Sequence, residues 1–289
     1  PLAVRRRSLD VLFNPGFTAP AFCSCPCVTV FHDLQHKSHP EHFRWFDLPF
    51  WRLFLWASAH RSQLLLADSE ATRRDLLRFY RIAPEKVRVA PLGVDASFFE
   101  LGSQRRELEP LLLCVSTLHP HKNLERLVRV FGRLRQRRPE FRLVIAGLRG
   151  FHTSAVERLI VKSGLGESVR LTGWISRPEL AELYRRAYAF VYPSTFEGFG
   201  LPVLEALAAG VPTACSAIEP LGSLAGEAAV QFDPTVDEAL LAALERLICD
   251  EGLRARLARE GPLRAARFSW DRTAALTLDA LRAAASLKM

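Results

Sequence analysis

Short apolar runs alternate with helical patterns along the whole chain, and this alternation restricts the possible fold more than any other feature. Apolar runs bounded by Pro, Asn, Asp or Gly are typical of strands that are buried on both faces. They lie at 11–13, 28–31, 64–67, 87–90, 111–115, 143–146, 169–172, 189–192, 213–215 and 229–232. The helical pattern at 71–80 follows Ser69, a residue that can cap a helix N-terminus. The alternation predicts an α/β fold with doubly wound parallel sheets.

The length and the apolar content indicate two domains. A chain of 289 residues with 49% hydrophobic residues can bury two modest cores. The polar stretch 95–110 divides the apolar runs into two groups and is typical of a linker. We therefore expect two Rossmann-like domains, 1–105 and 106–270, followed by a helical segment at 271–287. No apolar run reaches the roughly 18 residues of a membrane-spanning helix, so we expect a soluble protein.

One glycine-bracketed turn carries two carboxylates, within the run STFEGFGLPVLEALAAGVP. Pro202 suits the first position of a helix and Gly210 suits the position after its last turn, which predicts a helix over 202–209. Glu197 then lies in the loop and Glu205 lies inside the helix. The two carboxylates are therefore expected on either side of the helix N-terminus.

The start of this helix is a candidate anion site. Gly198 and Gly200 allow the backbone to approach a ligand closely, and the N–H groups of the first turn can bind a diphosphate. Glu197 can accept hydrogen bonds from sugar hydroxyls, while Glu205 can accept them from a ribose. This combination of groups predicts a site for a nucleotide sugar.

Two further candidates follow predicted strands. Lys122 lies beside the start of a predicted helix over 123–138, which Asn123 can cap, and a cation in this place favours phosphate binding. His32 follows the run 28–31, so it is expected at the carboxyl end of a parallel strand, where open α/β sheets bind ligands.

These motifs together resemble the retaining glycosyltransferases of family 4, a group 1 family with the GT-B fold. In chain order they are FHDL from Phe31, ADSEAT from Ala67, PLGVD from Pro91, PHKN from Pro120, VIAG from Val144, PSTFEGFGLPVLEA from Pro193 and FSW from Phe268. The resemblance covers roughly the whole chain, and several ordered motifs are stronger evidence than one short pattern.

The resemblance implies a retaining, metal-independent hexosyltransferase that needs no cofactor. Its donor would be a GDP- or UDP-linked sugar, and mannose is favoured because TLHPHKN from Thr117 resembles mannosyltransferases. Its acceptor would be a hydroxyl of a glycan or of a lipid-linked acceptor, as in polysaccharide biosynthesis. Negative charge grows on the leaving diphosphate, and Lys122 and the backbone amides at 198–200 are expected to stabilise it.

The family's functional residues map onto this chain motif by motif. The expected catalytic residues are His32, Asp33, Lys122 and Glu197. The expected donor-binding residues are Thr117, His121, Lys122, Trp174, Ile175, Glu197, Gly198, Phe199, Gly200, Leu201 and Glu205. Thr117 and His121 occupy the places where the family usually has an assisting arginine.

The resemblance also makes predictions about the ends of the chain. The family's last helix crosses back onto the N-terminal domain, as 271–287 is expected to do. The family's N-terminal domain opens with a strand and a glycine-rich loop that are not found here, so this domain is expected to be incomplete by roughly 80–100 residues. Two alternative functions stay open, a nucleotide-sugar-binding module without catalysis and a nucleotide-sugar isomerase of the same fold.

The net charge of +8 does not indicate a nucleic-acid partner. The arginines are scattered over helical patterns, and no RNA-binding motif with stacking aromatics is found. The segment 43–56 combines aromatic residues with arginines. We favour its burial against the N-terminal sheet, and peripheral contact with an anionic membrane is the alternative.

The cysteines and histidines do not indicate a metal site. Six cysteines without paired CxxC hooks favour a reducing compartment, which predicts a cytoplasmic protein, with the inner face of the membrane as a peripheral alternative. The group of Cys23, Cys25 and Cys27 is explained by alternate residues that share one face of an extended segment. His36, His39 and His42 are irregularly spaced and lack a matching carboxylate set, so no metal ligand is expected among them.

Overall fold

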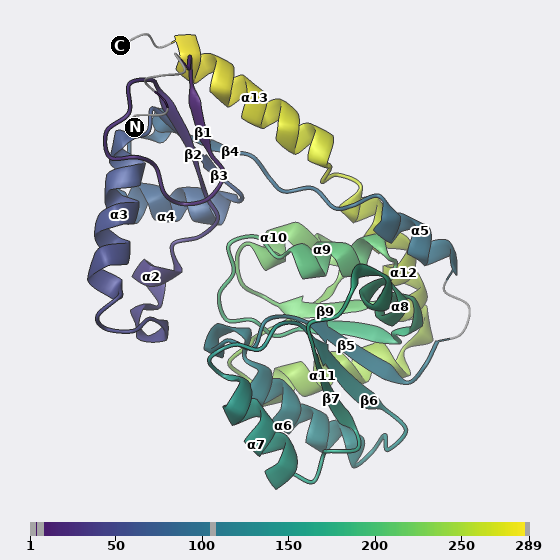
Figure 1. Ribbon diagram of the computed structural model, residues 1–289. Helices are drawn as coiled ribbons and strands as arrows, with labels where there is room; N and C mark the ends of the chain where they lie inside the picture. Colours follow the sequence, from purple (N-terminus) through teal and green to yellow (C-terminus); the bar gives the residue numbers. More distant parts are fainter. Residues whose placement is uncertain (1–3, 5–8, 105–107, 287–289) are drawn as a thin grey trace. The chain divides into compact units, whose positions relative to one another are not determined.

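The computed structural model describes residues 4, 9–104 and 108–286, which form two compact α/β units (Figure 1). One unit consists of Pro1–Gly93 with Phe268–Met289, and the other of Val94–Arg267. Each unit has its own parallel sheet with helices on both faces. The predicted α/β fold with two parallel sheets is therefore confirmed, and every apolar run expected to be a strand is one, with small differences at the ends.

The first unit is built on a four-stranded sheet with the order β1-β2-β3-β4, in which all neighbours are parallel. Its strands are β1 (Leu12–Asn14), β2 (Cys27–Phe31), β3 (Leu64–Ala67) and β4 (Val87–Val89). Its helices are α2 (Gln35–Ser38), α3 (Leu48–Arg61), α4 (Glu70–Tyr80) and α13 (Trp270–Ser286), with the short 3-10 turns η1 (Pro40–His42) and η2 (Pro84–Lys86).

Alternate strand residues of this sheet face two different helix layers, as the period of two requires. Leu65 lies in one core cluster with Leu55 of α3 and Leu76 of α4. Leu66 lies in the other cluster with Ala280 of α13. The helix α4 begins as predicted, because the Ser69 hydroxyl accepts a hydrogen bond from the Thr72 N–H at 3.1 Å.

The second unit is built on a six-stranded parallel sheet with the order β10-β9-β8-β5-β6-β7. Its strands are β5 (Leu111–Val115), β6 (Arg142–Ala146), β7 (Val169–Gly173), β8 (Ala189–Tyr192), β9 (Thr213–Ser216) and β10 (Val230–Phe232). The chain runs outward from β5 to β7, then returns to the other side of β5 and continues to β10. Because the order reverses there, the carboxyl ends of β5 and β8 form the topological switch point at which such sheets bind ligands.

Helices cover both faces of this second sheet (Figure 1). They are α5 (Ser97–Gln104), α6 (Leu124–Arg135), α7 (Thr153–Lys162), α8 (Arg177–Arg186), α9 (Leu201–Ala208), α10 (Leu221–Ala225), α11 (Asp237–Cys249) and α12 (Glu251–Ala265), with the 3-10 turns η3 (Pro120–Lys122) and η4 (Gly226–Ala228). The core on one face joins α6, α7 and α11 to alternate residues of the strands, such as Leu112 and Ile145.

The stretch expected to be a linker is partly helical. Residues 97–104 form α5, and Phe98 of this helix is buried with its ring edge against the ring of Tyr184, at 5.4 Å between centroids. This packing places α5 in the second unit, so the boundary lies at Gly93 and Val94 rather than near residue 105. Residues 105–107 of the expected linker, most of the first ten residues and Leu287 of the expected last helix lie outside the described part.

The aromatic segment 43–56 is largely exposed, so the favoured interpretation that it is buried was wrong. Phe50 is 65% exposed and Phe54 is 58% exposed on α3, and Trp45 before the helix is 84% exposed. The reason is that α3 carries large apolar side chains around its whole circumference, while only one narrow stripe, which includes Leu55, packs on the sheet. No helix among residues 4, 9–104 and 108–286 is both long and apolar enough to cross a bilayer.

Candidate functional site

Two of the predicted catalytic side chains meet at the switch point of the second sheet. Lys122 ends the turn that follows β5, and Glu197 lies in the loop that follows β8. The Lys122 Nζ donates to Glu197 Oε1 at 2.6 Å and to the Tyr192 hydroxyl at 2.9 Å. The Lys122 and Glu197 side chains are only 13% and 10% exposed. Both charges of this pair are shielded from water. Removing one partner would leave the other as a buried charge without a counter-ion.

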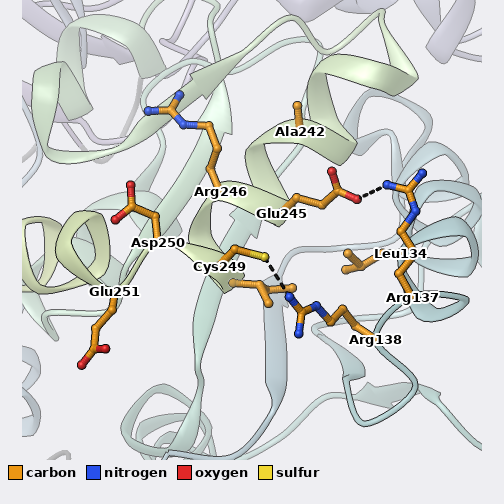
Figure 2. A pocket seen from close by; sticks show the side chains of 10 residues that line it. Leu134, Arg137, Arg138, Ala242, Glu245, Arg246, Cys249, Asp250 and Glu251 are labelled. Carbon is orange, nitrogen blue, oxygen red and sulfur yellow. Dashed lines mark hydrogen bonds and ion pairs between the residues drawn. The ribbon is translucent and has the colours of Figure 1, made fainter.

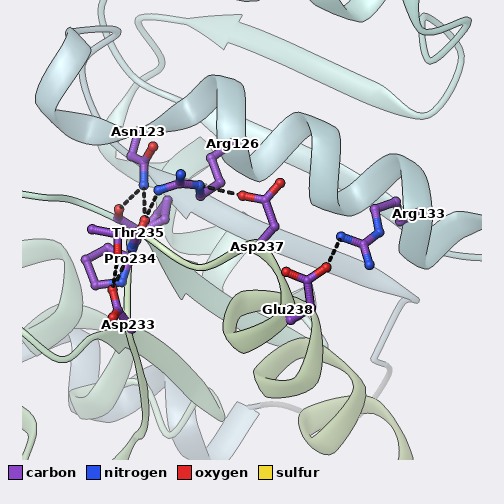
Figure 3. Close-up of polar contacts among 9 residues, drawn as sticks. Asn123, Arg126, Arg133, Asp233, Pro234, Thr235, Asp237 and Glu238 are labelled. Atoms are coloured by element: carbon purple, nitrogen blue, oxygen red, sulfur yellow. Dashed lines mark hydrogen bonds and ion pairs between the residues drawn. The ribbon is translucent and has the colours of Figure 1, made fainter.

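Hydrogen bonds to main-chain carbonyls fix the two loops against each other. The Thr195 N–H and hydroxyl both donate to the His121 carbonyl, at 2.8 and 3.1 Å. The Asn123 amide donates to the carbonyls of Pro193, at 3.1 Å, and Pro234, at 2.9 Å (Figure 3). Asn123 therefore does not cap α6 with its side chain as expected, because it adopts a left-handed conformation and binds these carbonyls instead.

A residue of α6 also holds the loop before α11. Arg126 of α6 donates to Asp237 at 2.6 Å and also to the Pro234 carbonyl, as Figure 3 shows. Asn123 and Arg126 thus both donate to the carbonyl oxygen of Pro234. This clamp ties the carboxyl edge of β10 to the carboxyl edge of β5.

Glu205 lies inside α9 as predicted, and the tyrosine of a neighbouring helix binds it. The Tyr184 hydroxyl donates to Glu205 Oε2 at 3.0 Å. Burial raises the pKa of Glu205 to about 7, and the hydrogen bond from Tyr184 opposes this only in part. Near neutral pH this carboxyl is therefore divided between its acidic and ionised forms.

A row of stacked rings links the surroundings of the two carboxylates. Tyr184 stacks on Phe190 with centroids 5.8 Å apart, and Phe190 stacks on Tyr192 with centroids 6.1 Å apart. Tyr184 thus reaches Glu205, while Tyr192 accepts from Lys122. The sequence interpretation assigned no role to either tyrosine. The usable signal was that a buried tyrosine hydroxyl needs a hydrogen-bond partner.

The start of α9 was expected to offer backbone N–H groups to a diphosphate. The Val203 N–H donates to the Gly200 carbonyl at 3.0 Å, and Pro202 has no N–H group. Gly200 adopts a φ of +112°, and a Cβ on it would overlap the side chain of Leu221 in α10. Gly200 is therefore required by geometry, and anion binding by the backbone at 198–200 stays a prediction.

The remaining predicted donor-binding residues lie at the same edge of the sheet. Thr117 follows β5 and is half-buried, and the ring of His121 stacks on that of His119 with centroids 5.9 Å apart. Trp174 follows β7 and is 73% exposed, so its ring does not pack in the core, and Ile175 is half-buried. The loop after β8 supplies Gly198 and Phe199, of which Phe199 is buried, and Leu201 is the first residue of α9.

His32 and Asp33 lie in the first unit, after β2. The His32 Nδ1 lies 2.7 Å from Asp68 Oδ2, and Nε2 lies 3.1 Å from the Pro15 carbonyl oxygen. Both neighbours accept hydrogen bonds, so only the doubly protonated ring satisfies both. The hydrogen bond to Asp68 is the main reason that the pKa of His32 is raised.

Asp33 acts on the backbone in this structure, because it accepts from the Gln35 N–H at 2.9 Å at the start of α2. Asp68 follows β3 and was not singled out as a site residue, although its motif was recognised. The structure thus brings together Lys122 with Glu197 in one unit and His32 with Asp68 in the other. A joint role for the four predicted catalytic residues stays a prediction.

A cavity of about 750 Å³ in the second unit lies elsewhere (Figure 2). It is lined by the C-terminal ends of α6 and α11, including Arg138, which donates to the Cys249 Sγ at 3.0 Å, and Arg137, which pairs with Glu245 at 2.6 Å. Because α6 returns from the carboxyl end of β5 to the amino end of β6, this cavity is at the opposite edge of the sheet from Lys122 and Glu197. It is not part of the candidate site.

Known protein families match both parts of the chain. The family described as Glycosyl transferases group 1 matches residues 99–264, and Glycosyltransferase Family 4 matches residues 2–98. The O-antigen chain mannosyltransferase B of Escherichia coli is 27% identical over 267 residues, covering 88% of this chain and 70% of that protein. The MMP alpha-(1->4)-mannosyltransferase of Mycolicibacterium hassiacum is 30% identical over 295 residues, covering 96% of this chain and 71% of that protein.

A solved structure has the same fold. Sucrose-phosphate synthase from Thermosynechococcus elongatus matches with a TM-score of 0.80 and 21% identity, over 97% of this chain and 75% of that chain. This likeness concerns the architecture, and it confirms the GT-B fold that the motifs predicted.

Proposed function

The chain belongs to the group 1 glycosyl transferases, and on this premise we propose that it transfers a hexose from a nucleoside diphosphate sugar to a hydroxyl group of a glycan or lipid-linked acceptor. The observation that carries the proposal is the shielded pair of Lys122 and Glu197 at the switch point. These two charges suit the two ends of such a donor, since Lys122 can bind the diphosphate and Glu197 can accept from sugar hydroxyls.

Donor binding would replace the ion pair by two new contacts. The diphosphate takes over Lys122 as its counter-ion, which frees Glu197 for the sugar, and Tyr192 keeps the ammonium group in position. As the glycosidic bond breaks, negative charge grows on the diphosphate, and the fixed cation of Lys122 lowers the energy of that state. The ionised form of Glu205 accepts from the ribose hydroxyls at the other end of the ring row.

We assign the finer features of the reaction by the same reasoning and by resemblance. Two mannosyltransferases among the relatives favour mannose, with GDP or UDP as the nucleotide. Lys122 supplies the positive charge that a metal ion supplies in other transferases, so a metal-independent reaction is proposed, with retention at the anomeric carbon as in the resembled family. His32, held at Nδ1 by Asp68, can donate its Nε2 proton to an oxygen of the transferred group in place of the Pro15 carbonyl.

The proposal is tested first by calorimetric titration with GDP, UDP, ADP and their sugar conjugates. Lys122→Met should weaken diphosphate binding, whereas the matched control Lys162→Met, an exposed lysine on α7, should bind like the wild type. Loss of a charge-assisted contact of about 1.5–3 kcal/mol corresponds to roughly a 10- to 150-fold rise in Kd. Equal affinity of both variants would refute the role of Lys122.

The alternatives give different results with the intact donor. A binding module would bind the nucleotide sugar and transfer nothing to any glycan or lipid-linked acceptor. An isomerase would change the sugar nucleotide with no acceptor present. Glycosyl transfer requires both the donor and the acceptor, and the one-bond coupling between the anomeric carbon and its proton in the product reports whether the configuration is retained.

We also propose that the exposed face of α3 makes peripheral contact with an anionic lipid surface. The helix Leu48–Arg61 contains no Asp or Glu, and Arg52 and Arg61 accompany exposed Phe50 and Phe54, a composition typical of interfacial helices. Co-sedimentation with phosphatidylglycerol vesicles should be lost in Phe50→Ser with Phe54→Ser and kept in Phe151→Ser, an exposed aromatic of the other unit. Equal binding of the two would refute this assignment.

A further inference from the structure

Three side chains of metal-ligating type gather between α2 and the end of η1. They are His39, Glu41 and His42, and their ligand atoms all lie within 4.8 Å of one another. Among residues 4, 9–104 and 108–286, no other group of three such side chains has its ligand atoms this close together. We propose that these three residues bind a divalent first-row metal ion of the zinc class.

The distances are close to those of a metal-ligand set. The His39 Nδ1 lies 3.0 Å from Glu41 Oε1, and the His42 Nε2 lies 3.9 Å from the same oxygen. Ligands about 2.1 Å from a tetrahedral zinc ion are about 3.4 Å apart. The two distances to the Glu41 oxygen each differ from this by about half an ångström, and the two histidine nitrogens, which lie within 4.8 Å of each other, approach by side-chain rotation on binding. The stacked rings of His39 and His42, inclined by 12° with centroids 5.3 Å apart, already present both nitrogens toward the carboxylate.

The chemistry of the three groups suits this class of ion. Two imidazoles and one carboxylate form a donor set that favours zinc and its neighbours over calcium or magnesium, which prefer oxygen ligands only. Three protein ligands leave at least one position for water or another ligand.

A second residue joins the group to the predicted catalytic loop. The Gln35 Nε2 lies 3.4 Å from the His42 Nδ1, and the Gln35 N–H donates to Asp33 at 2.9 Å. Turning the Gln35 amide over would bring its oxygen to the ring, so that Nδ1 carries the proton and Nε2 offers its lone pair to the ion, the arrangement usual for metal-bound histidine. A bound ion would therefore stiffen the chain between Asp33 and His42.

The proposal departs from the sequence expectation that no metal ligand lies among His36, His39 and His42, because the structure groups different residues. His36 was grouped with His39 and His42, but its Nε2 lies 2.7 Å from the Tyr80 hydroxyl and its ring is buried. The carboxylate that the sequence pattern lacked is Glu41, which the 3-10 turn Pro40–His42 places between the two histidines.

The experiment is calorimetric titration of the full chain with Zn²⁺ alone, in a non-coordinating buffer. We expect one site in the wild type and a Kd raised at least 10- to 100-fold in His39→Ala and in His42→Ala, the size of effect seen even for outer-shell partners. His60→Ala is the matched control, since His60 lies on α3 of the same unit and its Nδ1 donates to the Trp56 carbonyl of its own helix. Circular dichroism confirms that each variant is folded.

Thiols are the competing ligands, because the Cys23 and Cys25 sulfur atoms lie only 3.6 Å apart. A titration with Co²⁺ separates the two cases, since thiolate ligation produces intense charge-transfer absorption that imidazole and carboxylate do not. Three results would each overturn the proposal. Zn²⁺ binding could be lost in Cys23→Ser, it could be kept in both histidine variants, or the wild type could bind no Zn²⁺. Binding that survives Cys23→Ser and His60→Ala but is lost in His39→Ala and His42→Ala supports it. None of these readouts depends on glycosyl transfer.

Discussion

Replacing Glu205 by glutamine should stabilise the ligand-free protein above neutral pH. Burial raises the pKa of Glu205 from 4.5 to about 7 in the folded protein. The folded state therefore keeps a proton that the unfolded chain releases, so stability is highest below pH 4.5 and is lost as the pH rises toward 7. One pKa unit corresponds to about 1.4 kcal/mol, so the loss is about 3 kcal/mol in all. Glutamine keeps the acceptor for Tyr184 and removes the titration.

The assay is urea unfolding followed by far-UV circular dichroism at pH 5 and pH 8, with a separate transition for each unit. The gain in unfolding free energy of Glu205→Gln over the wild type should be about 2–3 kcal/mol larger at pH 8 than at pH 5. Glu157→Gln, a change at an exposed residue of α7, is the control and should shift stability by less than about 0.5 kcal/mol at either pH.

A stability difference that is the same at both pH values would refute this account of Glu205. The same substitution should also weaken binding of the donor nucleotide, because glutamine cannot replace a carboxylate that accepts from two ribose hydroxyls. A more stable protein with weaker binding is the pattern expected of a residue that is retained for its ligand and not for the fold.

Two further changes test the geometry around the site. Gly200→Ala should lower the free energy of unfolding by about 1–2 kcal/mol for the left-handed backbone and by about 1–3 kcal/mol more for the overlap with Leu221. Gly164→Ala is the control, with a φ of +65° and open space around it, and should show only the first loss. Equal urea midpoints of the two variants would contradict the overlap. Asp68→Asn should lower the pKa of His32, because the substitution weakens the hydrogen bond that raises this pKa. Proton NMR of the His32 ring measures the titration, and an unchanged pKa would contradict that cause.

Much of the fold is encoded locally, and this is why the strands were predictable. Each strand is a short apolar run between residues that disfavour strands, such as Leu64–Ala67 before an Asp and a Ser. The helices that were missed lack such a local signature. In α12, Pro262 and two glycines interrupt the helical pattern, and the helix is maintained by packing on α9, where Gly261 lies against the Leu207 backbone.

The candidate site was predictable only in part, for a physical reason. The motif residues Lys122 and Glu197 were found because turn and helix signals surround them. Their partner Tyr192 and the His32 partner Asp68 were not, since those contacts join residues 70 and 36 positions apart. Contacts across parallel strands depend on strand order, and the order at β5 and β8 is a property of the folded sheet.

The divided first unit has a consequence for synthesis on the ribosome. The second unit is one uninterrupted segment, Val94–Arg267, so all of its core residues are available once that segment has emerged. The face of β2 and β3 that includes Val28 and Leu66 is covered by Ala280 and Ala284 of α13, which are made after the whole second unit. That apolar face therefore stays without its cover while the second unit is synthesised, which exposes the first unit to chaperones and aggregation during that time.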